Sequence, residues 1–245
     1  MKVCVLGDLH GAKLELPDAE LYMGVGDLSS LGDDPAHVRK RFYKAMGSTV
    51  DAMEKFFRSR WERDFMKYVS RTYSEIYEWL NSTGRPVFLV SGNREVIVDV
   101  LVKEFQQLGK GPYELVREFK NIQYIDNKAV DFHGLKIYGL PFIPSDEPYI
   151  PAYERSQPFK ERFDALRSAA VPGKPDIILS HSPPRGTLDK HSVAGYVGSA
   201  KVLAILNRKR PRYLFCGHIH ESKGMMKVGS TTVVNLGTTY ELFDL

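Results

Sequence analysis

The chain has 245 residues, of which 43% are apolar, and carries a formal net charge of +4 from 34 basic and 30 acidic side chains. This length suffices for one substantial hydrophobic core, and the composition is ordinary for a globular protein. A charge balance this mild does not by itself indicate a nucleic-acid-binding protein.

Cysteine usage and the N-terminal residues indicate the compartment. The two cysteines, Cys4 and Cys216, fall inside expected buried strands, which is typical of a reduced compartment rather than a disulfide framework. The N-terminal residues lack a signal-peptide pattern, and no apolar run reaches the ~20 residues that a membrane span requires. We therefore expect a cytoplasmic protein with no membrane span.

Short apolar runs alternate with stretches of helical spacing, which favours an α/β fold. Residues 128–132 with 135–138, and 225–228 with 231–234, are expected to form two hairpins because Gly-containing turns separate them. We predict a two-sheet mixed β sandwich flanked by helices, as a single domain over residues 1–245. Its strands are expected at 3–6, 21–25, 87–90, 122–125, 135–138, 177–179, 213–215, 225–228 and 231–235.

A helical insertion is expected at about residues 33–81. Apolar residues recur there at helical spacing and predict one long helix over about 50–80. The other face of this helix is basic, and three interpretations stand: a solvated face, a cap that gathers anionic substrate, or an arm that forms a homo-oligomer. A shorter helix is expected at 157–170, after a proline-rich surface loop at 141–158.

Seven side chains of types that bind metals follow expected strands at the point where each strand ends. In an open α/β sheet, ligands bind outside the carboxyl ends of parallel strands, so we expect all seven at one edge. The glycines that precede several of them permit tight turns out of the strands. The seven are Asp8, His10, Asp27, Asn93, His181, His218 and His220.

Histidine nitrogens, carboxylates and a carboxamide oxygen suit Mn, Fe, Zn or Co rather than a soft metal, because no thiolate is included. Asp8 and His10 are two residues apart, as are His218 and His220. In an extended segment, side chains at i and i+2 point the same way, so each pair is expected to bind one cation. A single His or Asp at a strand end is usually a turn residue or a buried polar group, but the whole set favours metal binding.

The motifs, in order, are Asp8-Leu-His10, Gly26-Asp27, Gly92-Asn93, His181 and Gly217-His218-Ile-His220. Together they resemble the calcineurin-like metallophosphoesterase superfamily, over residues 4 to about 240. The stretches HSPPRGTLD and GHIHESKG resemble its small phosphodiesterase-like branch rather than its protein phosphatases.

The resemblance implies a division of the ligands between two divalent metal ions. Asp8, His10 and His220 would hold the first, Asn93, His181 and His218 the second, and Asp27 would bridge them. A shared carboxylate and a shared hydroxide would offset the repulsion between two cations ~3.5–4 Å apart. The expected reaction is hydrolysis of a phosphate ester, most plausibly a phosphodiester in a small or nucleotide substrate, by attack of the metal-bridging hydroxide.

Position 94 departs from the family pattern. The family usually has a His after the Gly-Asn, and this chain has Arg94. An arginine does not act as proton donor near neutral pH, but it binds phosphate oxygens bidentately. Our hypothesis is that Arg94 binds the phosphoryl group, with a salt bridge to Glu95 or a neighbour as the structural alternative. In the family, that His acts as general acid or contacts the substrate phosphate. Four other residues are candidates for the general acid in this chain: His191, Asp189, Asp33 and Asp34.

Two other functions compete with the phosphoesterase. A non-catalytic scaffold of the same fold would fit the missing His, but it has no need of seven intact ligands. A metal-dependent nuclease would use the basic helix along a phosphate backbone, and the mild net charge disfavours it. Two further residues near the C-terminus, Asn235 and Tyr240, are expected as a turn-capping residue and a packed ring, with a place at the edge of the site as the alternative.

Overall fold

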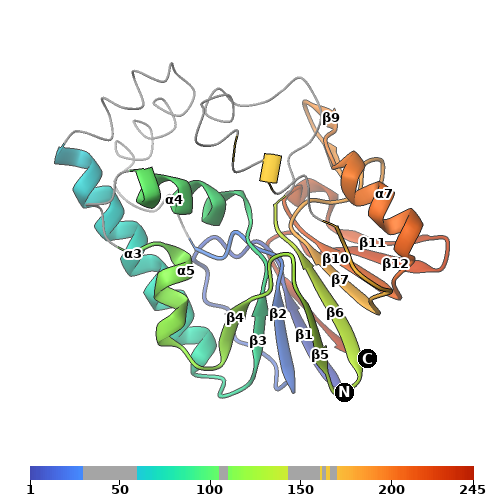
Figure 1. The fold of residues 1–245 in the computed structure, drawn as a ribbon, viewed down its shortest axis with the longest axis horizontal. Helices are drawn as coiled ribbons and strands as arrows, with labels where there is room; N and C mark the ends of the chain where they lie inside the picture. Colours follow the sequence, from blue (N-terminus) through green and yellow to red (C-terminus); the bar gives the residue numbers. More distant parts are fainter. Residues whose placement is uncertain (30–59, 105–109, 143–160, 162–163, 166–169) are drawn as a thin grey trace.

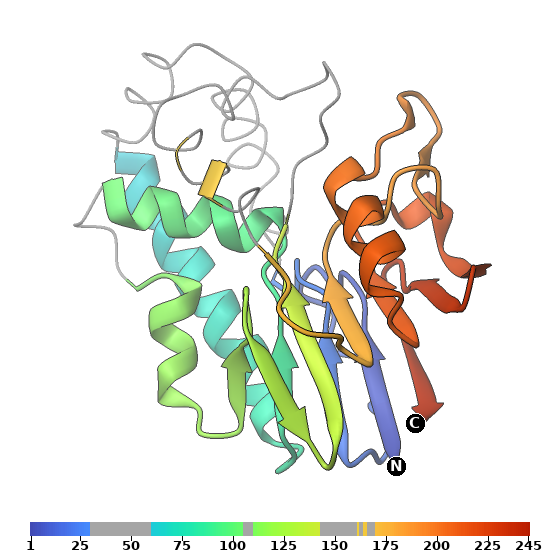
Figure 2. The same ribbon diagram turned by 45° about the vertical axis from the view of Figure 1, so that its right-hand side comes forward.

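The computed structural model describes residues 1–29, 60–104, 110–142, 161, 164–165 and 170–245. Two large β-sheets lie face to face, and helices cover the outer side of each (Figures 1 and 2). The predicted α/β class and the two-sheet mixed sandwich are therefore confirmed.

The first sheet has the strand order β13-β1-β2-β3-β4. Strands β1 to β4 run parallel, and β13 pairs antiparallel with β1. Strand β13 was not predicted, and it places Tyr240 opposite Leu6 in the sheet. The bounds are β1 Lys2–Leu6, β2 Leu21–Gly24, β3 Val87–Leu89, β4 Ile122–Tyr124 and β13 Tyr240–Asp244.

The second sheet has the order β11-β12-β10-β7-β6-β5. Its four central strands run parallel, and the two edge strands close the predicted hairpins β5–β6 and β11–β12. A short third ladder, β8 Lys190–His191 with β9 Gly195–Tyr196, was not expected. The bounds are β5 Ala129–Phe132, β6 Leu135–Leu140, β7 Ile177–Ser180, β10 Tyr213–Cys216, β11 Gly224–Val228 and β12 Thr231–Asn235.

Alternation along the strands divides the core into three layers. In β1, Val3 and Val5 pack between the two sheets, while Cys4 and Leu6 face the helices on the other side. A third cluster joins the outer face of the second sheet to helix α7. Both cysteines are buried in these layers as free thiols. Burial on both faces explains why the strands read as continuous apolar runs.

Four α-helices are present in the described residues: α3 Arg60–Asn81, α4 Asn93–Glu104, α5 Pro112–Leu115 and α7 Ala200–Lys209. Short 3-10 turns span Val116–Glu118 and His220–Ser222. Helices α3 and α4 cover the first sheet, and α7 covers the second (Figure 1). Helices α4 and α7 were not predicted. Within the described residues, no helix is long and apolar enough to cross a membrane.

The long predicted helix is described from Arg60 onward. The apolar residues Val69, Tyr73, Ile76 and Leu80 are buried at helical spacing against the first sheet. Arg71 on the opposite face pairs with Glu75 at 3.8 Å and is 67% exposed, so this part of the basic face is solvated. Residues 33–59, most of the expected helix at 157–170 and most of the loop at 141–158 lie outside the described residues, so the insertion at 33–81 stays a prediction.

Candidate metal centre

The seven predicted residues follow the carboxyl ends of β1, β2, β3, β7 and β10, in loops that we call the rim. Side chains as far apart in sequence as Asp8 and His220 are in contact there. Three of the seven have a left-handed backbone: His10 (φ 49°), Asp27 (φ 50°) and His218 (φ 67°). Non-glycine residues rarely adopt this conformation, and it concentrates at functional sites.

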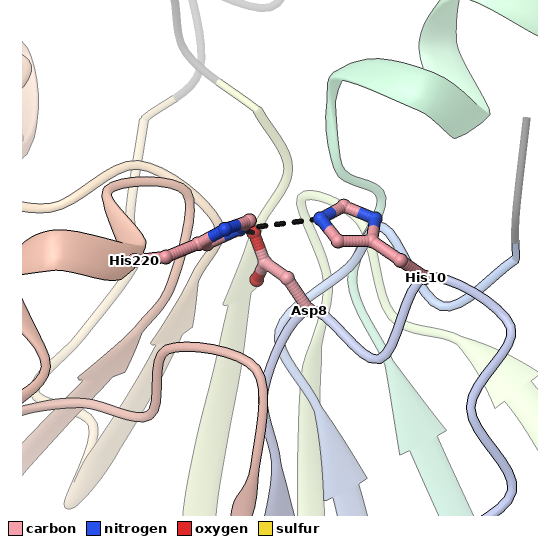
Figure 3. Close-up of side chains that lie close together, drawn as sticks. All are labelled: Asp8, His10 and His220. Carbon is pink, nitrogen blue, oxygen red and sulfur yellow. Dashed lines mark hydrogen bonds and ion pairs between the residues drawn. The ribbon is translucent and has the colours of Figure 1, made fainter. Parts of the chain in front are cut away.

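The first group on the rim is Asp8, His10 and His220, whose ligand-type atoms all lie within 4.8 Å of one another. Figure 3 shows the two rings tilted relative to each other, with their Nε2 atoms directed at one another beside the carboxylate. These Nε2 atoms lie 3.2 Å apart. Asp8 Oδ2 accepts hydrogen bonds from the backbone N–H of His218 at 2.8 Å and from His220 Nε2 at 3.0 Å. Asp8 is fully buried, while the His220 side chain is 38% exposed.

The second group is Asn93, His181 and His218. His181 is fully buried, and its Nδ1 lies 2.9 Å from the carbonyl oxygen of Val25. A carbonyl oxygen only accepts, so Nδ1 carries a proton and donates it to Val25. His181 Nε2 lies 3.0 Å from Asn93 Oδ1 and 3.1 Å from His218 Nδ1. Fixing one ring nitrogen on a backbone carbonyl is the arrangement by which proteins orient a metal-binding histidine.

Asp27 lies between the two groups. It is within ligand distance of Asp8 and His181, since ligand-type atoms of these three buried residues fall within 4.8 Å of one another. Arg94 contacts Asp27 twice, through its backbone N–H to Oδ1 at 2.9 Å and its Nε to Oδ2 at 3.4 Å. The expected alternative was a surface salt bridge from Arg94 to Glu95 or a neighbour, and the ion pair is made with the buried Asp27 rather than with Glu95.

Burial shifts the pKa values of several side chains on the rim, and two of the shifts favour cation binding. It lowers the pKa of His10 to about 4, helped by the Arg94 charge, and that of His218 to about 3. Both rings are therefore neutral near pH 7 and offer lone pairs. Burial opposes ionisation of Asp27, but the charges of His181 and Arg94 outweigh it and lower the pKa. Burial raises the pKa of Asp8, and the hydrogen bond to Asp8 raises that of His220.

The donor set fits divalent cations. Buried polar atoms normally have hydrogen-bond partners, yet Asp8 Oδ1 is buried without one. In the second group, His181 Nε2 faces the carboxamide oxygen of Asn93, an arrangement that a cation between them would satisfy. Imidazole and oxygen donors without a thiolate match Mn, Fe, Zn or Co.

The two histidines of Gly217-His218-Ile-His220 do not point the same way, contrary to the expectation from their spacing. His218 contacts His181, whereas His220 contacts Asp8. The positive φ at His218 is the reason, because the alternation of side chains holds only for an extended backbone. The pair therefore contributes one ring to each group, in line with the division that the resemblance implies.

Two of the four candidates for the general acid lie in the part of the chain that the structure describes, and neither joins one of the two ligand groups. Asp189 is fully buried, and its Oδ2 accepts the backbone N–H groups of Gly186 and Gly198 at 2.9 and 2.8 Å. It therefore organises the loop that follows His181. His191 Nδ1 accepts two backbone N–H groups of its own hairpin at 3.2 Å. Asp33 and Asp34 lie outside the described residues.

Two buried side chains support the rim, and one of them, Glu95, was missed from sequence. Glu95 was considered only as a partner of Arg94, but it is fully buried and accepts backbone N–H groups of two rim loops. Burial, and then the charge of Asp27, raises its pKa to about 7. Asn235 is the expected turn cap: it is buried, its Oδ1 accepts the backbone N–H of Gly237 at 2.9 Å, and its amide donates to the carbonyls of Leu188 and Ile219 at 3.0 Å. An acidic residue directly before the apolar run 96–98 was the available signal for Glu95.

Comparison with known proteins agrees with this geometry. The family profile described as calcineurin-like phosphoesterase matches residues 1–222. A UPF0046 protein of Caenorhabditis elegans is 24% identical over 247 residues, covering 99% of this chain and 57% of that protein. The human metallophosphoesterase domain-containing protein 1 is 30% identical over 174 residues, covering 64% of this chain and 52% of that protein. A solved crystal structure superposes with a TM-score of 0.63 at 19% identity, over 99% of this chain and 94% of that one, which shows the fold alone.

The fold and the His, Asp and Asn groups on its rim define a class, the metal-dependent phosphoesterases. The chain belongs to the calcineurin-like phosphoesterase family, which uses divalent metal ions. It spans about half the length of the curated relatives that it matches, 57% and 52% in the two cases above.

Proposed function

We propose that the chain hydrolyses phosphate esters, specifically phosphodiesters in a small or nucleotide substrate, with two divalent metal ions. Asp8, His10 and His220 would hold one ion, and Asn93, His181 and His218 the other. The observation that carries the proposal is the position of Asp27, a buried carboxylate within ligand distance of Asp8 and His181, where it would bridge the two ions. When bound, such ions supply a nucleophile at neutral pH and neutralise charge on phosphate oxygens.

The chain's own residues would orient the ester. Asn93 and Arg94 begin helix α4, whose N-terminus points backbone N–H groups and a partial positive charge toward the rim. The Arg94 side chain is 19% exposed and lies against Asp27, so it borders the space beside the proposed ions. A guanidinium in this position has donors left over for phosphoryl oxygens. We therefore propose that Arg94 binds the phosphoryl group rather than donating a proton.

The direct test is turnover of bis- and mono-p-nitrophenyl phosphate with Mn²⁺, Zn²⁺ or EDTA. The wild type is compared with Asp27→Ala, and with Asp99→Ala as the matched control, because Asp99 is also buried but pairs with Lys103 on α4. We expect metal-dependent turnover of the diester that Asp27→Ala abolishes and Asp99→Ala retains. Two bound ions without turnover of any ester would favour the scaffold, and salt-dependent DNA binding would favour the nuclease.

The role of Arg94 is tested by KM and by inhibition with inorganic phosphate. Arg94→Ala should raise both KM and the inhibition constant, and Arg94→Lys should recover only part of the loss because it lacks the planar fork. Since Arg94 also contacts Asp27, Mn²⁺ affinity is measured in parallel to separate substrate binding from metal binding. Unchanged KM and phosphate inhibition in Arg94→Ala would refute this role. A cytoplasmic location and a homo-oligomer through the insertion stay predictions.

A further inference from the structure

Glu95 connects two loops of the rim from beneath. Its Oε2 accepts the backbone N–H groups of Asp27 and Gly92, both at 2.8 Å. Its Oε1 accepts the backbone N–H of Leu28 at 3.2 Å and the hydroxyl of Tyr73 at 3.1 Å. One carboxylate thus joins the loop after β2, the loop after β3 and helix α3. We propose that Glu95 is a positioning residue that places the Asp27 carboxylate for cation binding.

The backbone of Asp27 needs such support. Its φ of 50° lies in the left-handed region, which costs a non-glycine residue of order 1–3 kcal/mol unless the surroundings hold it. The peptide groups on both sides of Asp27 are held: its N–H donates to Glu95, and its C=O accepts the N–H of His10 at 3.0 Å. The carboxylate itself accepts the backbone N–H of Arg94. Asp27 therefore has a fixed orientation, and one of the contacts that fix it comes from Glu95.

Only a carboxylate satisfies all four donors. Both oxygens of Glu95 face donors, and a carboxylate accepts at both. A glutamine accepts at one oxygen only, so its NH₂ group would face N–H groups and leave at least one of them buried without a partner. An aspartate is one methylene shorter and does not reach both loops.

The matched controls lie on helix α3. Tyr73 touches Glu95, whereas Tyr77, one turn further along, is equally buried but bonds the hydroxyl of Tyr124 at 2.9 Å and the carbonyl of Pro112 at 3.3 Å. Tyr73→Phe and Tyr77→Phe each remove one buried hydroxyl from the same core. Only Tyr73→Phe alters the surroundings of Glu95, so the pair separates positioning of Asp27 from general stability.

The experiment is calorimetric titration of Mn²⁺ into the full chain, together with the melting temperature of each variant without metal. The inference rests on Asp27 binding metal, as in the proposed function. Glu95→Gln should weaken Mn²⁺ binding by about 10- to 100-fold, the usual effect of removing a supporting hydrogen bond from a metal site. Tyr73→Phe should weaken it less, and Tyr77→Phe should lower the melting temperature without changing the Mn²⁺ affinity.

Wild-type Mn²⁺ affinity in Glu95→Gln, with only a lowered melting temperature, would overturn the proposal. If Glu95→Gln does not fold, equal Mn²⁺ affinity in Tyr73→Phe and Tyr77→Phe overturns it instead. A wild type that binds Mn²⁺ and hydrolyses no ester refutes the proposed function alone, because the positioning role is judged on binding. A wild type that binds no Mn²⁺ overturns both.

Discussion

The substitution Gly217→Ala, which adds a single methyl group, should weaken metal binding at the rim. The backbone of Gly217 is not left-handed, so alanine is tolerated there as far as φ is concerned. A Cβ at this position would overlap Asp8 Oδ1 and lie 3.0 Å from both Asp8 Cγ and Val25 Cγ2. Asp8 is fully buried, so the new methyl group and the carboxylate cannot avoid each other by moving into solvent. The carboxylate must therefore shift, and Gly217→Ala moves a proposed metal ligand without altering its chemistry.

The magnitude follows from what the shift breaks. Asp8 Oδ2 holds the His218 N–H at 2.8 Å and His220 Nε2 at 3.0 Å. Hydrogen bonds to a charged group contribute about 1.5–3 kcal/mol each, and a 1 Å misplacement in an active site costs about 10²-fold in rate. We expect Mn²⁺ affinity to fall at least about tenfold, and turnover of bis-p-nitrophenyl phosphate about a hundredfold.

Gly224→Ala is the control for this substitution. Gly224 begins β11, its φ is also not left-handed, and a Cβ there would meet nothing closer than Leu188 Cδ2 at 3.6 Å, an ordinary contact. Its Mn²⁺ affinity and turnover should stay within about twofold of wild type, since surface-like substitutions rarely exceed 0.5 kcal/mol. Wild-type Mn²⁺ affinity and turnover in Gly217→Ala would refute the reasoning.

Three further predictions concern stability. Mn²⁺ at 100 times its Kd should add about 2.7 kcal/mol per site and raise Tm by roughly 5–11 °C, and EDTA should reverse this; no shift would argue against binding to the folded state. Asn235→Ala leaves the buried carbonyls of Leu188 and Ile219 without their partner, so urea denaturation should show a loss of about 1–3 kcal/mol, and a neutral result would contradict it. Ser199 caps α7 by accepting the N–H of Val202, so Ser199→Ala should cost about 0.5–2 kcal/mol and leave Mn²⁺ affinity unchanged; an equal loss of Mn²⁺ affinity would show that α7 is coupled to the rim.

Strands were easier to predict than helices in this chain, and burial explains the difference. The parallel strands are covered on both faces and therefore read as apolar runs with sharp ends, as in β7 and β10. Helix α4 carries the β-branched run VIVDVLV, whose local preference favours a strand. Its residues are nearly all buried in the same core cluster as α3, and this packing overrides the local preference. Strand β13 was missed because its five residues, YELFD, do not alternate regularly between apolar and polar.

The rim was predictable as a set of residues, but its support was not. Each proposed ligand follows a strand end and is visible in sequence by its type and position. Glu95 and Asn235 act through backbone N–H and C=O groups of distant loops, and no spacing rule marks such contacts. Asp189 was proposed as an acid because of its type, whereas its Oδ2 is occupied by the turns of its own loop. Support of this kind depends on which loops the fold brings together.

Residues with a left-handed backbone explain how two histidines that lie two positions apart contact different groups. Along an extended segment, His218 and His220 would present both rings on one side, and His181 would lack its neighbour at 3.1 Å. The positive φ at His218 turns its ring toward His181, while the chain continues so that His220 reaches Asp8. His10 and Asp27 have the same backbone conformation on the facing loops. Three such residues cost of order 1–3 kcal/mol each, and a fold retains that strain where it places side chains that regular strands do not bring together.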